Sequence, residues 1–134
     1  MIFVDAGAWY ALSDSGDPNH RPAAAFYRDL ARGRHGRLVT SDYVMDETYT
    51  LLRMRGGLGS VRRLRDLVEE PKSMELLWVS PEDFARALEM MLQHEDKRWS
   101  FTDCTSFVLM QGLGIQEAFA FDPNFAQAGF ALHP

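Results

Sequence analysis

The sequence has a single cysteine, Cys104, in 134 residues, and it has no long uninterrupted apolar run. One cysteine cannot form an intramolecular disulfide, so a hydrophobic core must stabilise the fold. No apolar stretch approaches the roughly 20 residues that a membrane-spanning helix requires, and the first residues lack the basic segment and apolar core of a signal peptide. We therefore expect a cytoplasmic protein that does not enter a membrane.

Several catalytic sequence motifs are also missing. The sequence has no Walker A loop, no G-x-G-x-x-G and no G-x-S-x-G. Cys104 lies beside an aspartate in a predicted helix, which favours a small packing residue over a nucleophile. The four histidines lack the paired spacing of a zinc site, and we interpret them as surface residues: His20, His35, His94 and His133.

Lysine is scarce, because only 2 of the 14 basic residues are lysines, and the formal net charge is −5. This charge argues against a protein that binds nucleic acid through an overall positive surface, but it leaves room for a local basic strip. Arginine suits bidentate contacts to phosphate or carboxylate groups. A genomic preference for arginine codons would produce the same bias.

Apolar residues, in contrast, make up 46% of the chain, which is enough to fill the core of one domain. Short apolar runs alternate with segments of helical periodicity, a pattern typical of a largely parallel sheet with helices on both faces. The expected strands are 2–4, 38–40, 74–79, 118–121 and, as a short edge strand, 129–132. The expected helices are about 8–12, 22–32, 42–55, 59–70, 81–95 and 100–111, and Pro71 is expected to end the fourth.

The first strand leads directly into a carboxylate. Ile2-Phe3-Val4 is apolar on both faces, which predicts a buried strand in the middle of the sheet. Asp5 then lies at the carboxyl edge of the sheet, where ligands bind in open α/β folds. Alternatively, Asp5 only caps the helix that follows.

Three further acids fall at comparable positions. Asp122 follows a predicted strand, Asp103 begins a helix, and Glu47 lies in the second turn of the helix after the second strand. Each also has a purely structural alternative: a capping box between Ser100 and Asp103, a turn at Asp122, and exposure to water at Glu47. Four carboxylates at one edge would repel one another unless a cation were bound, and oxygen ligands favour Mg²⁺ or Mn²⁺. Such an ion suits phosphoryl chemistry.

The order and spacing of these acids resemble those of the PIN-domain ribonucleases, and within them the toxins of VapBC-type toxin–antitoxin modules. The matching segments span essentially the whole chain: Phe3-Val4-Asp5, Ala8-Trp9-Tyr10-Ala11-Leu12, Ser41-Asp42-Tyr43-Val44, Glu47-Thr48, Ser100-Phe101-Thr102-Asp103, Phe121-Asp122 and Phe125. The resemblance implies an α/β fold, a PIN-like three-layer α/β/α sandwich with a mostly parallel central sheet of four to five strands. It also implies a single PIN domain over residues 1–134.

The same resemblance implies endonucleolytic cleavage of RNA with Mg²⁺ or Mn²⁺ as cofactor. The implied metal ligands and catalytic acids are Asp5, Glu47, Asp103 and Asp122. Thr102 is expected to support the site by hydrogen bonding, and Asn124 to orient Asp122 or a metal-bound water. Family members are inhibited by a cognate antitoxin and usually form dimers, so the implied partners are RNA, an antitoxin protein and a second copy in a homodimer.

One departure from the family pattern follows the first acid. The family commonly has a hydroxyl pair there, such as Thr-Ser, whereas this chain has Ala6 and Gly7. Because losing an outer partner of a metal site typically costs about 10- to 100-fold in affinity or activity, we expect weaker metal binding or slower turnover. All four acids remain, which favours an active enzyme.

Two surfaces are candidates for RNA and protein partners. An arginine rim could bind phosphates, or be no more than a solvated helix face: Arg53, Arg55, Arg62, Arg63 and Arg65. Tyr43 or Trp99 could stack on unpaired bases, although aromatics in a small domain are usually in the core. Apolar helix positions around Val61, Leu64 and Leu67 are candidates for a dimer or antitoxin surface.

Two other functions remain open. One is an RNA-processing PIN nuclease without an antitoxin, which only the genomic neighbourhood would distinguish. The other is a catalytically weak α/β domain that binds a partner and keeps its acids as caps or as a phosphoacceptor cluster. A receiver-like module would need a lysine after the strand at 118–121, and neither Lys72 nor Lys97 follows it. Metal binding separates an active nuclease from the partner-binding domain.

Overall fold

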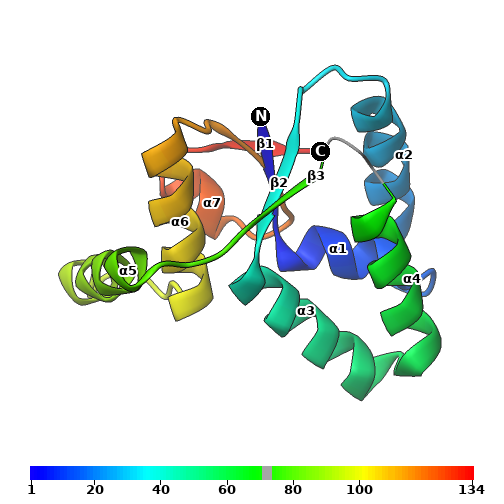
Figure 1. The fold of residues 1–134 in the computed structure, drawn as a ribbon, viewed down its shortest axis with the longest axis horizontal. Coiled ribbons are helices and arrows are strands. Elements are labelled where there is room, and N and C mark those ends of the chain that lie inside the picture. The colour runs from blue at the N-terminus through cyan, green and yellow to red at the C-terminus, as the bar shows by residue number, and fades with distance from the viewer. Residues whose placement is uncertain (71–73) are drawn as a thin grey trace.

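The chain forms one five-stranded parallel sheet in the order β3-β2-β1-β4-β5 (Figure 1). The computed structural model describes residues 1–70 and 74–134. The strands are β1 (Ile2–Val4), β2 (Leu38–Ser41), β3 (Met74–Leu77), β4 (Glu117–Phe119) and β5 (Ala131–His133). The predicted parallel sheet of four to five strands is therefore confirmed, and the first strand is its central one.

Helices cover both faces of this sheet. They are α1 (Ala6–Ser13), α2 (His20–Ala31), α3 (Asp42–Arg55), α4 (Gly57–Glu69), α5 (Pro81–Gln93), α6 (Phe101–Leu113) and α7 (Asn124–Gln127). In Figure 1, α5, α6 and α7 lie on one side of the strands and α1, α2 and α4 on the other. This is the predicted three-layer arrangement. Within the described ranges, no helix is long and apolar enough to cross a bilayer.

Serine caps explain where three of the helices begin. The hydroxyl oxygen of Ser41 accepts from the Val44 N–H at the start of α3, and Ser80 does the same for Asp83 at the start of α5. At the start of α6, Ser100 and Asp103 form a reciprocal capping box. The Ser41 cap lies at the carboxyl edge of the sheet, because α3 directly follows β2.

Several predicted boundaries differ from the structure. β3 ends at Leu77 rather than Val79, because the Val79 N–H donates to the Asp42 side chain over 3.0 Å instead of continuing the ladder. β4 begins one residue early and ends at Phe119. The four-residue helix α7 is not apparent from apolar periodicity because it is a single turn. The predicted helix end at Pro71 lies outside the described residues.

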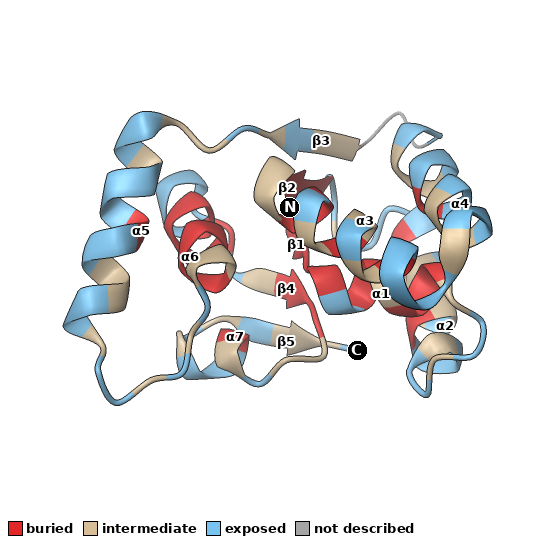
Figure 2. Cartoon of the chain, turned by 90° about the horizontal axis from the view of Figure 1, so that it is seen from below, coloured by how far each residue is buried: buried red, intermediate tan, exposed pale blue. Residues whose placement is uncertain are grey.

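The core surrounds the central strand. All three residues of β1 are fully buried, and Figure 2 shows buried residues concentrated in β1, β4, α1 and the inner face of α6. The Phe107 ring meets the Phe125 ring edge to face at 5.0 Å, and Phe125 in turn lies 6.5 Å from Phe3. This packing fixes α6 and α7 against the sheet, and therefore fixes the acids that these elements carry.

Candidate active site

The four predicted acids lie at the carboxyl edge of the sheet. Asp5 directly follows β1, Glu47 lies on α3, Asp103 lies in the first turn of α6, and Asp122 lies between β4 and α7. Figure 1 shows α1, α3 and the start of α6 meeting at this edge. Asp5 and Asp103 are only 6% and 8% exposed, while Glu47 and Asp122 are half-buried. The fold thus gathers carboxylates from four separate segments.

Burial raises the pKa of Asp5 from its ordinary 3.8 to about 7. The backbone amides of Ala6 and Gly7 favour the charged form, but the negative charges of Asp103 and Glu47 oppose it. Asp5 occupies the N-cap position of α1, where its carboxylate meets the backbone amides of Ala6 and Gly7. Its place at the helix start thus coexists with its place beside Asp103 and Glu47.

The pKa values of Glu47 and Asp103 are also raised, in both cases chiefly by burial. For Glu47, the charges of Asp103, Asp122 and Asp46 add to the effect of burial. For Asp103, hydrogen bonds from Ser100 and Asn124 partly offset burial, and the charge of Asp122 acts against them. These mutual effects link all four predicted acids through their negative charges.

Asn124 connects two of the acids. Its side-chain amide donates to Asp103 Oδ2 at 3.1 Å and to Asp122 Oδ2 at 3.3 Å. Asp122 also accepts the backbone N–H of Asn124 at 2.9 Å, which is the turn geometry expected for an aspartate at this point. The capping box at Asp103 and the turn at Asp122 thus coexist with membership of the carboxylate cluster.

A divalent cation fits this donor set. The acids offer only oxygen ligands, as Mg²⁺ and Mn²⁺ prefer, and their raised pKa values reflect charge that a cation would offset. No three of these four acids, all within the described ranges, have oxygens lying within 4.8 Å of one another. That spacing is expected for carboxylates that repel one another with no cation between them.

The other predicted site residues form no hydrogen bond or ion pair with the four acids in the described part of the chain. The Thr102 side chain makes no hydrogen bond to the acids within the described residues; its backbone carbonyl accepts from the Thr105 hydroxyl at 2.7 Å. The arginines of the predicted rim are exposed on α3 and α4. Arg63 donates to the Ser13 carbonyl and Arg65 pairs with Asp66, whereas Arg53, Arg55 and Arg62 form no ion pair with any described residue.

The interpretation of the histidines as surface residues is wrong. All four are half-buried, and His35 and His133 lie close to Glu117. No spacing in the sequence pointed to this cluster, because these three residues come from distant segments that only the sheet brings together. His20 and His94 instead pair with backbone carbonyls, those of Ala11 and Met90.

Val61, Leu64 and Leu67 of α4 face the core, so they do not form the candidate partner surface. Leu64 is fully buried, and Val61 and Leu67 pack against the core. Trp99 likewise packs on Phe107 at 5.1 Å between ring centres instead of facing solvent. A more exposed aromatic is Trp78, which is 73% exposed; it was missed because it continues the apolar run of β3.

Trp78 lines an apolar groove of about 600 Å³. The groove runs between β3, α3 and α4, and its lining includes Tyr43, Met45, Tyr49 and Leu76. Tyr43 is half-buried there and lies 6.0 Å from the Phe101 ring. An exposed apolar surface therefore exists beside α3, on the edge strand of the sheet.

Comparison with known proteins gives consistent matches along the chain. The PIN domain family profile matches residues 2–131. The chain is 36% identical over 135 residues to the 23S rRNA-specific endonuclease VapC20 of Mycobacterium tuberculosis, covering 97% of this chain and 95% of that protein. It is 26% identical over 124 residues to a VapC ribonuclease of Archaeoglobus fulgidus, covering 92% and 78% of the two chains. The crystal structure of M. tuberculosis VapC20, described as a sarcin-ricin loop cleaving toxin, superposes with a TM-score of 0.90 at 32% identity and covers 100% of both chains.

Proposed function

This chain belongs to the PIN-domain family, and we propose that it is a metal-dependent endoribonuclease that acts as the toxin of a type II toxin–antitoxin pair. The observation that carries the proposal is the convergence of four carboxylates, three with raised pKa values, at the carboxyl edge of the sheet. The similarity to rRNA-cleaving and VapC ribonucleases supports the same chemistry.

Mg²⁺ or Mn²⁺ would be held by Asp5, Glu47, Asp103 and Asp122. When bound, the ion stabilises negative charge on phosphate oxygens and makes water more acidic. Burial raises the pKa of Asp5 to about 7, and a bound cation would favour its charged form, so cation binding should displace a proton from Asp5 near neutral pH. Asn124 holds Asp103 and Asp122 in a fixed relative position, which limits the reorganisation needed when substrate binds.

The proposed substrate is RNA, bound partly by the exposed arginines at the end of α3. Arg55 lies eight residues after Glu47 on the same helix, a distance of about 12 Å along its axis. Arg53 and Arg55 are therefore within reach of phosphates beside the bond that the acids would cleave, and Arg62 on α4 is proposed to bind phosphate farther along the RNA. Ribosomal RNA is the first substrate to try, since the 36% identical relative is named for 23S rRNA.

VapC toxins pair with VapB antitoxins, and a cognate antitoxin is the proposed protein partner of this chain. We also propose that the chain forms a homodimer. Light scattering of the purified protein measures its mass, with a value near twice 15.3 kDa expected. A mass near 15.3 kDa at micromolar concentration would contradict the dimer.

RNA cleavage tests the proposed activity directly. The purified chain is incubated with structured and single-stranded RNA in Mg²⁺ or Mn²⁺, beside an EDTA control and the Asp103→Asn variant. Asp66→Asn is a matched control, because this exposed aspartate on α4 also loses one charge but lies outside the cluster. The proposal is supported if the wild type and Asp66→Asn cleave RNA, Asp103→Asn does not, and EDTA abolishes the cleavage. Equal background in all samples, together with no Mn²⁺ binding, would make the acids structural and favour a partner-binding domain.

A further inference from the structure

We propose that His35, Glu117 and His133 form a second divalent-metal site, of the kind that Zn²⁺ occupies, separate from the carboxylate site at the sheet edge. This inference does not depend on nuclease activity. It goes beyond the proposed function because it concerns residues from other segments and a different donor set.

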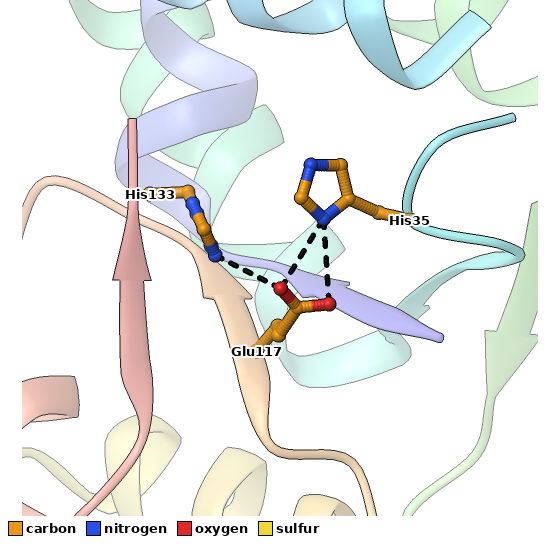
Figure 3. Close-up of side chains that lie close together, drawn as sticks. All are labelled: His35, Glu117 and His133. Carbon is orange, nitrogen blue, oxygen red and sulfur yellow. Dashed lines mark hydrogen bonds and ion pairs between the residues drawn. The ribbon is translucent and has the colours of Figure 1, made fainter. Parts of the chain in front are cut away.

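The three side chains point toward one another, as Figure 3 shows. His35 Nδ1 lies 3.2 and 3.3 Å from the two Glu117 carboxylate oxygens, and His133 Nε2 lies 3.1 Å from Oε1. One ligand atom from each residue falls within a group no wider than 4.8 Å. No other group of three or more His, Cys, Asp or Glu side chains in the described ranges meets that spacing.

Two of the three separations are close to those around a tetrahedral ion. With zinc–ligand distances of about 2.0 to 2.1 Å, two ligands of a tetrahedral site lie about 3.4 Å apart. The His–Glu separations are 0.1 to 0.3 Å shorter, and the two imidazole nitrogens lie within 4.8 Å of each other, so an ion would draw the three side chains into place. Two imidazole nitrogens and one carboxylate oxygen form a known zinc donor set, and they leave a fourth position for water.

Three separate parts of the fold build this cluster. His35 lies in the loop before β2, Glu117 begins β4, and His133 ends the edge strand β5. Glu117 and His133 meet diagonally across the ladder, in which Phe119 is paired with His133. Because Asp122 follows the other end of β4, the acids at the carboxyl edge and this cluster use different ends of the same strand.

The surroundings suit a structural ion. The Phe26 ring stacks on His133 at 5.3 Å with an interplanar angle of 5°, and lies 5.2 Å from the His35 ring. The three ligand side chains are 20 to 36% exposed, so water can reach the open position. Within the described residues, Glu117 is the sole hydrogen-bonding partner of both imidazoles, so no other protein group competes for the ligand nitrogens.

The carboxylate of Glu117 is available to a cation. Burial alone would raise the pKa of Glu117, but the hydrogen bonds and charges of His35 and His133 outweigh it and lower that pKa. Imidazole binds a metal in its neutral form, so Zn²⁺ would replace the protons that these histidines share with Glu117. A bound ion would join the loop before β2 to the edge strand β5, so metal binding should stabilise the folded chain.

Zinc titration of the tag-free, metal-stripped 134-residue chain tests the site, with ZnCl₂ alone as the probe. We expect a Zn²⁺ ion that wild type and Asp103→Asn bind equally, in addition to any Zn²⁺ that the four acids take up in the wild type. His133→Ala and Glu117→Gln should weaken binding at least about 100-fold, because each removes one of three ligands. His94→Ala is the matched control, because it removes a half-buried histidine outside the cluster and should leave binding unchanged.

Thermal unfolding and Co²⁺ absorption give independent measurements. Zn²⁺ at about 100 times its dissociation constant should raise the Tm by about 5 to 10 °C in wild type and by much less in His133→Ala. Co²⁺ should give the strong visible absorption of a four-coordinate ion. Glu117→Gln keeps the side-chain shape, so it tests the site even if His133→Ala folds poorly.

Two results would overturn the proposal. Zn²⁺ binding that survives His133→Ala and Glu117→Gln but disappears in Asp103→Asn would place the ion at the carboxylate edge instead. Absence of Zn²⁺ binding by folded wild type would leave a histidine–carboxylate hydrogen-bond cluster only. RNA cleavage by the same samples, measured in Mg²⁺, reports separately on the proposed nuclease function.

Discussion

The side-chain amide of Asn124 donates to Asp103 Oδ2 at 3.1 Å while its backbone N–H donates to Asp122 Oδ1 at 2.9 Å. One neutral residue at the start of α7 therefore holds two acids that belong to α6 and to the loop after β4. Hydrogen bonds to the carboxylate favour its charged form, and the Asn124 bond lowers the pKa of Asp103 against the effect of burial. Asn124 thus keeps Asp103 available to a cation.

Replacing Asn124 by alanine should weaken Mn²⁺ binding and RNA cleavage by about 10- to 100-fold, the usual cost of losing an outer partner of a metal ligand. The pKa of Asp103 should rise, because a donor to its charged form is lost. Isothermal titration with Mn²⁺ measures the affinity. Gln127→Ala is the control, because it changes an exposed amide on the same short helix. Equal Mn²⁺ affinity in wild type and Asn124→Ala would show that the amide does not support the site.

Lowering the pH should stabilise the metal-free protein between about pH 7 and pH 4. Folding raises the pKa of Asp5 from 3.8 to about 7, so in this interval the folded chain holds the proton more tightly than the unfolded chain. The stabilisation is fully present below pH 4 and is lost as the pH rises through 7. A shift of about three pKa units corresponds to roughly 4 kcal/mol, and the raised pKa values of Glu47 and Asp103 act in the same direction.

Asp5→Asn tests this linkage, because it removes the charge and keeps the shape of the side chain. At pH 8 without metal, the variant should unfold at a higher temperature than wild type, and the gap should close near pH 4. Mg²⁺ or Mn²⁺ should stabilise wild type more at pH 8 than at pH 5, because protons compete with the cation. Denaturation curves that show the same stability for both proteins across this range would contradict a raised pKa at Asp5.

Most of the fold and the positions of the four acids could be predicted from the sequence, because both depend on local sequence patterns. A fully apolar run predicts a central strand, and an acid directly after it must lie at the carboxyl edge, so Asp5 was predictable. Sites assembled from distant segments leave no such signal: His35 and His133 are separated by most of the chain. Exposure was also hard to predict: Leu64, within α4, is fully buried, whereas Trp78, directly after β3, is 73% exposed.

Removing positive charge from the end of α3 should weaken RNA binding in a salt-dependent manner. We expect Arg53→Gln with Arg55→Gln to reduce affinity and to lower the slope of log K against log salt by about 1.4, or about 0.7 for each lost phosphate contact with single-stranded RNA. Filter binding with the Asp103→Asn protein avoids cleavage during the measurement. Arg32→Gln with Arg34→Gln is the matched control, because these exposed arginines near the end of α2 pair with Asp29. Equal slopes in both double variants would show that the rim is a solvated helix face.

Cys104→Ala should leave RNA cleavage within about threefold of wild type. Burial raises the pKa of the Cys104 thiol to about 11, and the charge of Asp103 adds to this effect. At pH 7 only on the order of one thiol in ten thousand is then ionised, and the thiolate is the reactive form. The substitution should cost about 1 kcal/mol of stability by thinning the contact with Ala87 and Val108. Circular dichroism measures the folded fraction of each protein. A loss of cleavage larger than the loss of folded protein would indicate a direct role for the thiol.

Restoring a hydroxyl beside Asp5 should strengthen metal binding. Gly7 is exposed in the first turn of α1, and a Cβ there would lie 4.0 Å from Asp5 Oδ2, which is ordinary contact distance. Gly7→Ser therefore fits without displacing backbone, and its hydroxyl can donate to the carboxylate and favour the charged form. We expect Mn²⁺ affinity and cleavage to rise, by up to about 10-fold, the lower end of the effect of an outer partner.

Gly7→Ala separates the hydroxyl from the helix. Both substitutions should stabilise α1 by about 0.5 to 1 kcal/mol, because glycine is a poor helix former. Only the serine variant adds a donor near Asp5, so only it should bind Mn²⁺ more tightly at equal stability. If alanine and serine raise affinity equally, the gain comes from a more rigid helix start. The missing hydroxyl after the first acid would then have little bearing on the strength of the metal site.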